Sequence, residues 1–354
     1  MGLNSLNKLN YHFVCTNYGS NKDGIGHYTS KVVAGLKNKN NYQVYIYSRK
    51  TFHLSNLNLF LSFRMSKEIF KLIKKAYNNS EKSFIILEYP FVEYNPFLFF
   101  LLIILKFIIN KKSKIVVSLH EYNRTKKLRK FFIKGVVLLS DIVFYTDKED
   151  VKSFNKKNRS FIKRSIPANI QPSKEFKKEI IDNNVLNLCF FGIVNYSSKK
   201  IDTMITAWED YLCKNLENKI IFHFISSSND LSIKDNKNIQ YHYNLNDKDV
   251  SKLLSIMHYI ILPIMPKVSI NNGSLSVGCI HKCIPIGVFD SKHFNKNFGI
   301  SMKNYNEAEF IRVYNLINNL ELYKVENKRN VAFKYGLKKS IKNTMSAYMD
   351  IKYT

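Results

Sequence analysis

A glycine flanked by small polar residues begins a helix-like segment, where it could bind a phosphate group. The stretch INNGSLSVG, Ile270 to Gly278, reads as a loop running into a helix, with Asn272 or Ser274 placed to cap it. Backbone N–H groups at a helix start attract anions, and Gly273 would let a phosphate approach the backbone closely. An ordinary capped turn is the alternative interpretation.

Two adjacent lysines could supply positive charge to the same phosphate. Lys199 and Lys200 precede the helix-like stretch IDTMITAWEDYL. An ammonium group stabilises the negative charge that develops on a leaving phosphate. One of the two lysines is expected to bind phosphate, and the other to lie on solvated surface.

A second glycine-containing stretch, NYGSNKDGIGHYTS, follows the strand-like run YHFVC near the N-terminus. Its G-x-G spacing lacks the third glycine of a dinucleotide fingerprint, so a simple turn is one interpretation. The other is a ligand-binding loop in which Gly24 and Gly26 permit close approach and His27 or Tyr28 contacts the ligand.

Composition restricts the partners. The chain of 354 residues carries a formal charge of +28, which favours anionic partners, although a generally lysine-rich surface is an alternative explanation. Sequence signatures of nucleic-acid binding are absent, so we expect no nucleic-acid partner. The five cysteines form no C-x-x-C pair, and the N-terminal segment lacks an apolar signal core. These features predict a cytoplasmic protein without disulfides or a zinc site.

One segment is intensely apolar. PFLFFLLIILKFII, starting at Pro96, is shorter than the roughly 20 residues that a membrane-spanning helix needs. It is expected to be a buried core helix or, alternatively, an interfacial helix. In the second case the following NKKSK would lie near anionic lipid headgroups.

Strand-like and helix-like runs alternate along the whole chain, which predicts an α/β protein with parallel sheets covered on both faces. The alternation breaks at SIPANIQPSKEFKKEIIDNN, which reads as a linker. We therefore predict two Rossmann-like, doubly wound domains that face a central cleft. The predicted boundaries are 1–168 for the N-terminal domain, 169–185 for the linker, 186–330 for the C-terminal domain, and 331–354 for a C-terminal helix that packs back on the first domain.

The order of several short motifs resembles the GT-B glycosyltransferases, in particular family 4 of bacterial polysaccharide assembly. In the first half the motifs are GIGHYTSKVVAGL, VVSLHEY, SDIVFYTDKEDVKSF and SIPANI. In the second half they are FFGIVNYSSKKID, YHYNLNDKDVSKLLSIMHYIILPI and GCIHKCIPIG.

The resemblance implies a hexosyltransferase that moves a sugar from a nucleotide-sugar, most often a UDP-sugar, to a lipid-linked saccharide acceptor in capsule or O-antigen synthesis. It also implies retention of anomeric configuration and no metal or other cofactor. For such an enzyme, the positive charge and the apolar helix predict a peripheral position on the cytoplasmic, anionic face of the membrane. His120 and Glu121 take the catalytic positions. The acceptor-binding domain comes first, with a cleft segment of Gly24, Gly26, His27 and Tyr28. The donor-binding residues are Gly192, Lys199, Lys200, Asn272, Gly273, Ser274 and Ser276.

The sequence departs from the family at three charged positions. Ile193 lies where the family has an arginine, and Ile270 and Gly278 lie where it has two glutamates. The alternative function is therefore a catalytically inactive GT-B-like binding subunit of a polysaccharide assembly complex. Two further carboxylates, Glu88 and Glu93, follow a predicted strand, and we expect them to make surface or structural hydrogen bonds.

Overall fold

The chain forms two compact units in the computed structural model. Unit 1 comprises Met1–Ile166 and Lys342–Thr354, and unit 2 comprises Pro167–Ile341, so the chain passes between the units twice. The structure describes residues 9–15, 17–20, 24–39, 41–48, 67–75, 82–89, 96–109, 113–119, 122, 127–154, 159–173, 185–215, 218–295, 297–319 and 322–351.

Unit 1 contains a six-stranded parallel sheet in the order β2-β1-β3-β4-β5-β6. Its strands are β1 (Leu9–Val14), β2 (Tyr42–Tyr47), β3 (Ser83–Tyr89), β4 (Ser113–Leu119), β5 (Ile142–Tyr145) and β6 (Ser160–Lys163). After β2 the chain returns past β1 and continues in the opposite direction from β3. The carboxyl ends of β1 and β3 therefore flank the point where a doubly wound sheet opens a crevice.

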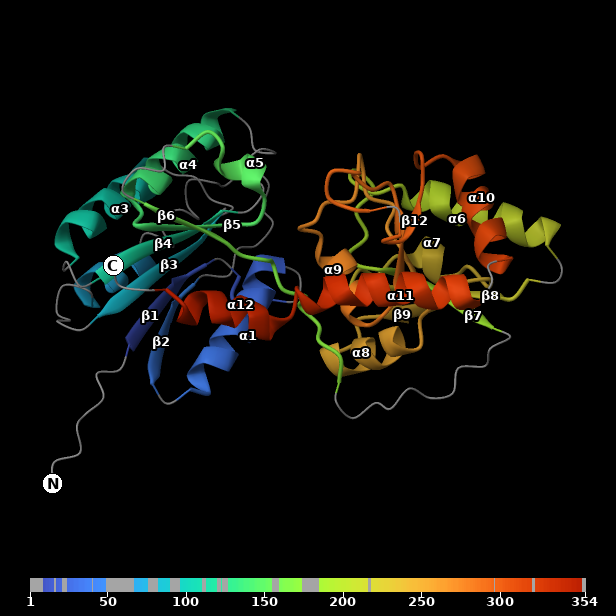
Figure 1. Ribbon diagram of the computed structural model, residues 1–354, viewed down its shortest axis with the longest axis horizontal. Coiled ribbons are helices and arrows are strands. Elements are labelled where there is room, and N and C mark those ends of the chain that lie inside the picture. The colour runs from blue at the N-terminus through green and yellow to red at the C-terminus, as the bar shows by residue number, and fades with distance from the viewer. Residues whose placement is uncertain are drawn as a thin grey trace, which may run out of the picture. The chain divides into compact units, whose positions relative to one another are not determined.

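Helices cover both faces of this sheet (Figure 1). On one face α1 (Gly24–Lys37) and α12 (Ile341–Met349) pack their apolar side chains. On the other face the helix over 67–75, α3 (Pro96–Ile108) and α4 (Lys127–Leu139) share a core with residues of β3 and β4. The short α5 (Lys148–Val151) follows β5. Burial on both faces explains why the strands are nearly continuous apolar runs.

Unit 2 repeats the arrangement with the strand order β12-β11-β10-β7-β8-β9, again with every pairing parallel. The strands are β7 (Leu186–Phe191), β8 (Ile220–Ser226), β9 (Gln240–Tyr243), β10 (Tyr259–Ile261), β11 (Ile284–Gly287) and β12 (Ile300–Ser301). Here the winding direction changes between β7 and β10, which lie side by side. The loops that follow these two strands meet at the carboxyl edge of the sheet.

The helices of unit 2 also form two layers. One layer contains α6 (Ile201–Lys214), α7 (Leu231–Lys234) and α10 (Glu307–Asn318), whose core includes the only tryptophan of the chain, Trp208. The other contains α8 (Asp247–Ser255), α9 (Gly273–Ile280) and α11 (Leu322–Leu337). α11 crosses close to α9. A Cβ atom at Gly336 would lie only 2.4 Å from the backbone nitrogen of Ile280. Only glycine allows this approach.

The division of the chain differs from the sequence prediction in two details. Unit 1 ends at Ile166, and the following Ala168 and Ile170 are buried in unit 2. Most of the predicted linker, 174–184, lies outside the described residues. The segment 331–354 divides, because α11 belongs to unit 2 and residues from Lys342 onward belong to unit 1. The C-terminal part of α12 packs on unit 1, with Tyr348 buried in its core.

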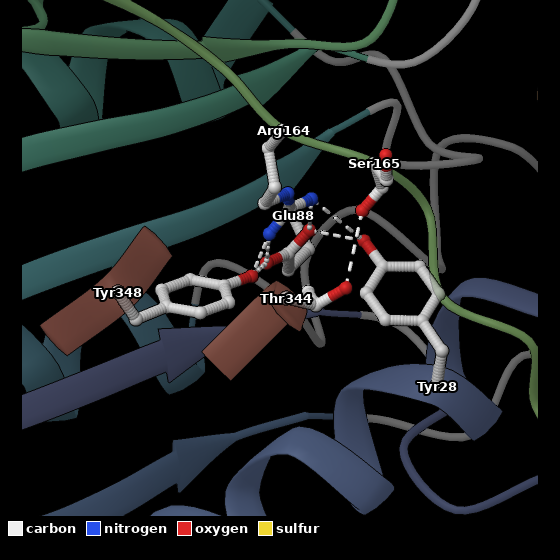
Figure 2. Close-up of polar contacts among 6 residues, drawn as sticks. All are labelled: Tyr28, Glu88, Arg164, Ser165, Thr344 and Tyr348. Carbon is white, nitrogen blue, oxygen red and sulfur yellow. Dashed lines mark hydrogen bonds and ion pairs between the residues drawn. The ribbon is translucent and has the colours of Figure 1, made fainter. Parts of the chain in front are cut away.

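A buried ion pair joins four separate segments of unit 1 (Figure 2). Glu88 on β3 and Arg164 after β6 are 0% and 1% exposed, and both guanidinium end nitrogens lie 3.2 Å from a carboxylate oxygen. Tyr28 of α1 and Tyr348 of α12 each donate a hydroxyl hydrogen bond to this carboxylate. Arg164 also bonds both tyrosine oxygens. The carboxylate is thus fully surrounded by donors.

This network fixes the chain where it passes between the units. Arg164 precedes the first crossing by two residues, and Tyr348 follows the second. Beside them Thr344 donates a hydrogen bond to the carbonyl of Ser165, at 3.3 Å (Figure 2). The expected structural hydrogen bonds of Glu88 are confirmed, but its expected place after a strand and at the surface is wrong: it lies within β3 and is buried. A carboxylate in the apolar run SFIILEY requires such a buried partner.

Removing the charge of Glu88 should therefore destabilise unit 1. We expect Glu88→Gln to lower the free energy of unfolding by about 3 to 5 kcal/mol, because it leaves Arg164 buried and uncompensated. Hydrogen exchange of β3 and β6 amides, read by mass spectrometry, measures this in unit 1. The fluorescence of Trp208 reports unit 2 in the same sample.

The matched control is Lys152→Met, which breaks the exposed pair between Lys152 and Glu149. Exposed pairs contribute about 0 to 1 kcal/mol, so exchange in unit 1 should hardly change. Equal effects of the two substitutions would contradict the role assigned to the buried pair.

Candidate functional site

The predicted donor-binding residues lie in the loop after β7 and at the N-terminus of α9, at the winding reversal of unit 2. The loop after β7 begins at Gly192 and contains Lys199, and the loop after β10 leads into α9. Backbone hydrogen bonds fasten the first loop to the second: Lys200 N to Pro263 O at 2.8 Å, and Met265 N to Ser198 O at 2.9 Å. The two loops therefore hold each other in place.

Gly192, Lys199 and Ser274 are brought together at this edge. A Cβ atom built on Gly192 would lie 2.9 Å from Ser274 Oγ and 3.2 Å from Lys199 Nζ. Gly192 also has a φ of +142°, a conformation that essentially only glycine adopts. The three residues thus border one small space that is open because residue 192 has no side chain.

Lys199 is a partly desolvated cation. Its ammonium group donates to the carbonyl of Ile193 and lies 5.1 Å from the centre of the Phe190 ring. Burial lowers the pKa of Lys199 from 10.5 to about 8. The loss of hydration makes the charged form costly, so an anion beside it would be bound strongly. Lys200 differs, because its side chain is exposed and only its backbone is held.

The N-terminus of α9 is a second source of positive charge at this edge of the sheet. Asn272 caps the helix through its side-chain oxygen, which accepts from Leu275 N at 2.8 Å. In this described region no acceptor is bonded to the N–H groups of Gly273 and Ser274, which belong to the first turn. The N-terminal end of a helix carries partial positive charge and binds anions. Ser276 is buried, and its hydroxyl bonds to Asn272 O at 3.1 Å.

Residues of α11 and of the turn that follows it bond the loop before α9 and fix its position. The carbonyl of Ile270 accepts hydrogen bonds from Tyr335 Oη at 2.9 Å and from Lys339 Nζ at 3.0 Å. Lys339 is buried, and its own carbonyl accepts from Ala168 N at 2.8 Å. One residue therefore connects the loop before α9 to the segment where the chain enters unit 2.

Gly278, one of the two positions where the resembled family has a glutamate, has no space for a side chain. A Cβ atom at Gly278 would lie 2.7 Å from Ile260 Cγ2, since α9 packs tightly on β10. Ile270 packs against the apolar core of this layer, and its carbonyl is already bonded twice. The absence of a glutamate at Gly278 thus accompanies a closer packing of α9 on β10. Ile193, where the resembled family has an arginine, is an exposed apolar residue.

The candidates of unit 1 are distributed differently from the prediction. Gly24 and Gly26 do not lie in a loop: they form the first turn of α1, and Gly26 O accepts from Gly19 N at 3.0 Å. His27 is buried on the same helix. Tyr28 is buried and bonds Glu88 and Arg164, so it faces the protein interior. A ligand role for these residues stays a prediction.

Two catalytic candidates, His120 and Glu121, lie outside the described residues, as does Glu93. β4 ends at Leu119, directly before them in the sequence. In the part of the chain that the structure describes, no group of three or more His, Cys, Asp or Glu side chains could hold a metal ion. The expectation of a reaction without cofactor stays a prediction.

Sequence reasoning missed the residues that hold the loop before α9 and the buried ion pair of unit 1 in place. Arg164, Tyr348, Tyr335 and Lys339 were not singled out, although each is buried or half-buried and hydrogen-bonded. The hydrogen-bond partners of their side chains named above lie between 65 and 260 residues away along the chain. The one signal available in the sequence was Glu88 itself, a carboxylate within an apolar strand, which requires a buried partner.

No model of a known protein family matches the chain, and no curated protein sequence matches it. Solved structures do match over nearly the full length. The N-terminal domain of Candida albicans trehalose-6-phosphate phosphatase gives a TM-score of 0.63 at 10% identity, covering 99% of this chain and 97% of that one. A putative UDP-N-acetylglucosamine 2-epimerase from Listeria monocytogenes gives 0.64 at 8% identity, covering 98% of both chains.

A third similar structure is a UDP-GlcNAc 2-epimerase from Neisseria meningitidis bound to UDP-GlcNAc, with a TM-score of 0.60 and 11% identity. It covers 97% of this chain and 100% of the other. At such low identity the likeness concerns the fold alone. The predicted fold class, GT-B with two Rossmann-like parallel-sheet domains, is confirmed.

The geometry around Gly192 predicts a pair of contrasting substitutions. Gly192→Ala should lower the stability of unit 2 by about 1 to 3 kcal/mol, because φ is unfavourable for alanine and the new Cβ meets Ser274 and Lys199. Gly273→Ala should have little effect, since a Cβ there meets nothing within 4 Å. Urea unfolding followed by Trp208 fluorescence measures both. A Gly192→Ala protein as stable as wild type would refute the close approach.

Proposed function

We propose that the protein is a glycosyltransferase that uses a nucleotide-sugar donor. The observation that supports this is the grouping of Gly192, Lys199 and Ser274 beside the N-terminus of α9. Ligands of doubly wound sheets bind where the winding direction changes, beyond the carboxyl ends of the strands. The site combines an ammonium group, a hydroxyl and first-turn N–H groups, which together suit a diphosphate.

In the proposed reaction the donor's bond between the anomeric carbon and the diphosphate oxygen breaks, and an acceptor hydroxyl forms the new glycosidic bond. The nucleoside diphosphate leaves with the bonding electrons. Lys199 and the N–H groups of α9 stabilise the charge on this leaving group, and they need no metal to do so. His120 and Glu121 are assigned to the reacting centre, where the acceptor hydroxyl loses its proton.

The finer parts of the proposal come from the sequence motifs. A UDP-sugar is the proposed donor, and the similar N. meningitidis epimerase was solved with UDP-GlcNAc. The proposed acceptor is a lipid-linked saccharide of capsule or O-antigen synthesis, used at the cytoplasmic face of the membrane. Retention of anomeric configuration is also proposed.

The first experiment is turnover. Purified protein is incubated with UDP-, GDP-, CMP- and ADP-linked sugars and a lipid-linked acceptor extract, and release of the nucleotide is measured with the product identified by mass spectrometry. We expect one donor class to be consumed, with a Lys199→Met variant slower by about 10²-fold or more, the scale for removing one group that stabilises developing charge. Conversion of the donor sugar without transfer would instead indicate an epimerase.

Nucleotide binding should depend on pH through Lys199. The ammonium form binds phosphate, so affinity for UDP should be constant below about pH 8 and fall about tenfold per pH unit above it, as the free lysine loses its proton. Calorimetric titration from pH 6.5 to 9.5 measures this. Lys199→Arg should remove the dependence, while Lys200→Met, which changes an exposed neighbour, should keep it. An unchanged profile in Lys199→Arg would exclude Lys199 from the phosphate site.

The second candidate function is a binding subunit without catalysis. It is favoured by the absence of acidic side chains at Ile270 and Gly278. Both functions predict binding of a nucleotide that weakens in Lys199→Met. Only the enzyme predicts turnover, so tight binding with no consumption of any donor would favour the subunit.

A further inference from the structure

Three neighbouring elements cover one face of the unit 1 sheet: the helix over 67–75, α3 and α4. They share one apolar core, into which Leu72, Leu105 and Val136 point. Figure 1 shows α3 and α4 side by side on this face. We call their solvent-facing side the outer helical surface.

The outer helical surface exposes large apolar side chains. In the described part of unit 1, every exposed large hydrophobic residue lies on these three helices: Phe70, Phe100, Phe107, Phe131 and Leu138. Phe107 is 84% exposed and Phe131 is 71% exposed. Phe100 and Phe107 are seven residues apart on α3, as are Phe131 and Leu138 on α4, so each pair points in one direction. Side chains of this size are normally buried.

The same surface is positively charged. On the helix over 67–75 the exposed lysines are Lys67, Lys71, Lys74 and Lys75, and on α4 they are Lys127 and Lys134. The sequences of α3 and α4 contain no acidic residue. The only one on the three helices, Glu68, is buried and pairs with Lys71 at 3.1 Å.

Apolar and basic residues alternate on this surface rather than forming separate patches. On α4 the exposed positions run Lys127, Phe131, Lys134, Leu138, with lysine and apolar side chains in turn. The core of a protein–protein interface is depleted in lysine, so this pattern does not suit a second protein or a second copy of this chain. It suits the boundary of an anionic bilayer, where rings enter the headgroup region and ammonium groups meet lipid phosphates.

We propose that the outer helical surface binds the surface of an anionic lipid bilayer, with Phe107 and Phe131 as its main apolar anchors. Attachment is peripheral: within the described ranges no helix has the length and apolar character needed to cross a bilayer. The inference rests on the proposed function only for the reason the protein is at a membrane, namely a lipid-linked acceptor. The binding itself requires neither donor nor turnover.

The test is co-sedimentation of the full chain with vesicles at about 0.1 M salt. Phosphatidylcholine vesicles containing about 30% phosphatidylglycerol are compared with pure phosphatidylcholine. Three variants are used: Phe107→Ser with Phe131→Ser, Lys127→Glu with Lys134→Glu, and the control Tyr243→Ser with Leu316→Ser. The control removes exposed apolar side chains of unit 2.

We expect wild type and control to bind the anionic vesicles at least tenfold more tightly than the neutral ones. The phenylalanine variant should lose about tenfold or more in affinity, since partial burial of each ring contributes on the order of 1 kcal/mol. The lysine variant should lose at least as much, at about 1 kcal/mol per basic residue. UDP affinity should be unchanged in both.

Other outcomes would overturn the proposal. Equal binding of all variants, or no binding by wild type, would exclude this surface as the membrane contact. Dimerisation by sedimentation velocity that is lost in the phenylalanine variant would identify a self-interface instead. Salt-dependent binding of an oligonucleotide that is lost in the lysine variant would identify a nucleic-acid surface. A failed vesicle test with intact donor turnover leaves the proposed enzyme function standing.

Discussion

The buried pair of Glu88 and Arg164 is the constraint on which unit 1 depends. A charge in an apolar interior costs several kcal/mol unless hydrogen bonds surround it, so the carboxylate needs every one of its donors. Those donors come from α1, α12 and the residue after β6. The C-terminal helix is therefore part of the folding unit, although it follows the whole of unit 2 in the sequence. The network also fixes both chain segments at the passage between the units.

In unit 2 a comparable set of hydrogen bonds joins the segment where the chain enters the unit to the segment where it leaves. Lys339 bonds Ala168 through its backbone and the loop before α9 through its side chain. Its ammonium group and the hydroxyl of Tyr335 bond one carbonyl, that of Ile270. The loop before α9 is therefore positioned by residues that never face the site. A phosphate-binding helix start is useful only if it is fixed before the ligand arrives.

The site itself concentrates its positive charge in few groups. Ile193, where the resembled family has an arginine, supplies no positive charge, and Gly278 allows α9 to approach Ile260. Lys199 is left as a half-buried cation beside Gly192 and Ser274. Because burial weakens the hydration of its ammonium group, a bound diphosphate would gain more from this lysine than from the exposed Lys200. Desolvation thus compensates for a small number of charges.

The sequence by itself determined the alternation of strands and helices, the two parallel sheets and a capped helix start at Asn272 or Ser274, whereas the structure chose Asn272 and brought Gly192, Lys199 and Ser274 together. The first three features follow from local patterns, because apolar runs and capping residues act within a few positions. The sequence did not determine that Gly24 begins a helix, that the short β6 and β12 complete the sheets, or that α11 and α12 belong to different units. Those outcomes, like the partners of Glu88 and Ile270, join residues far apart in the chain, and only burial in the folded structure decides them.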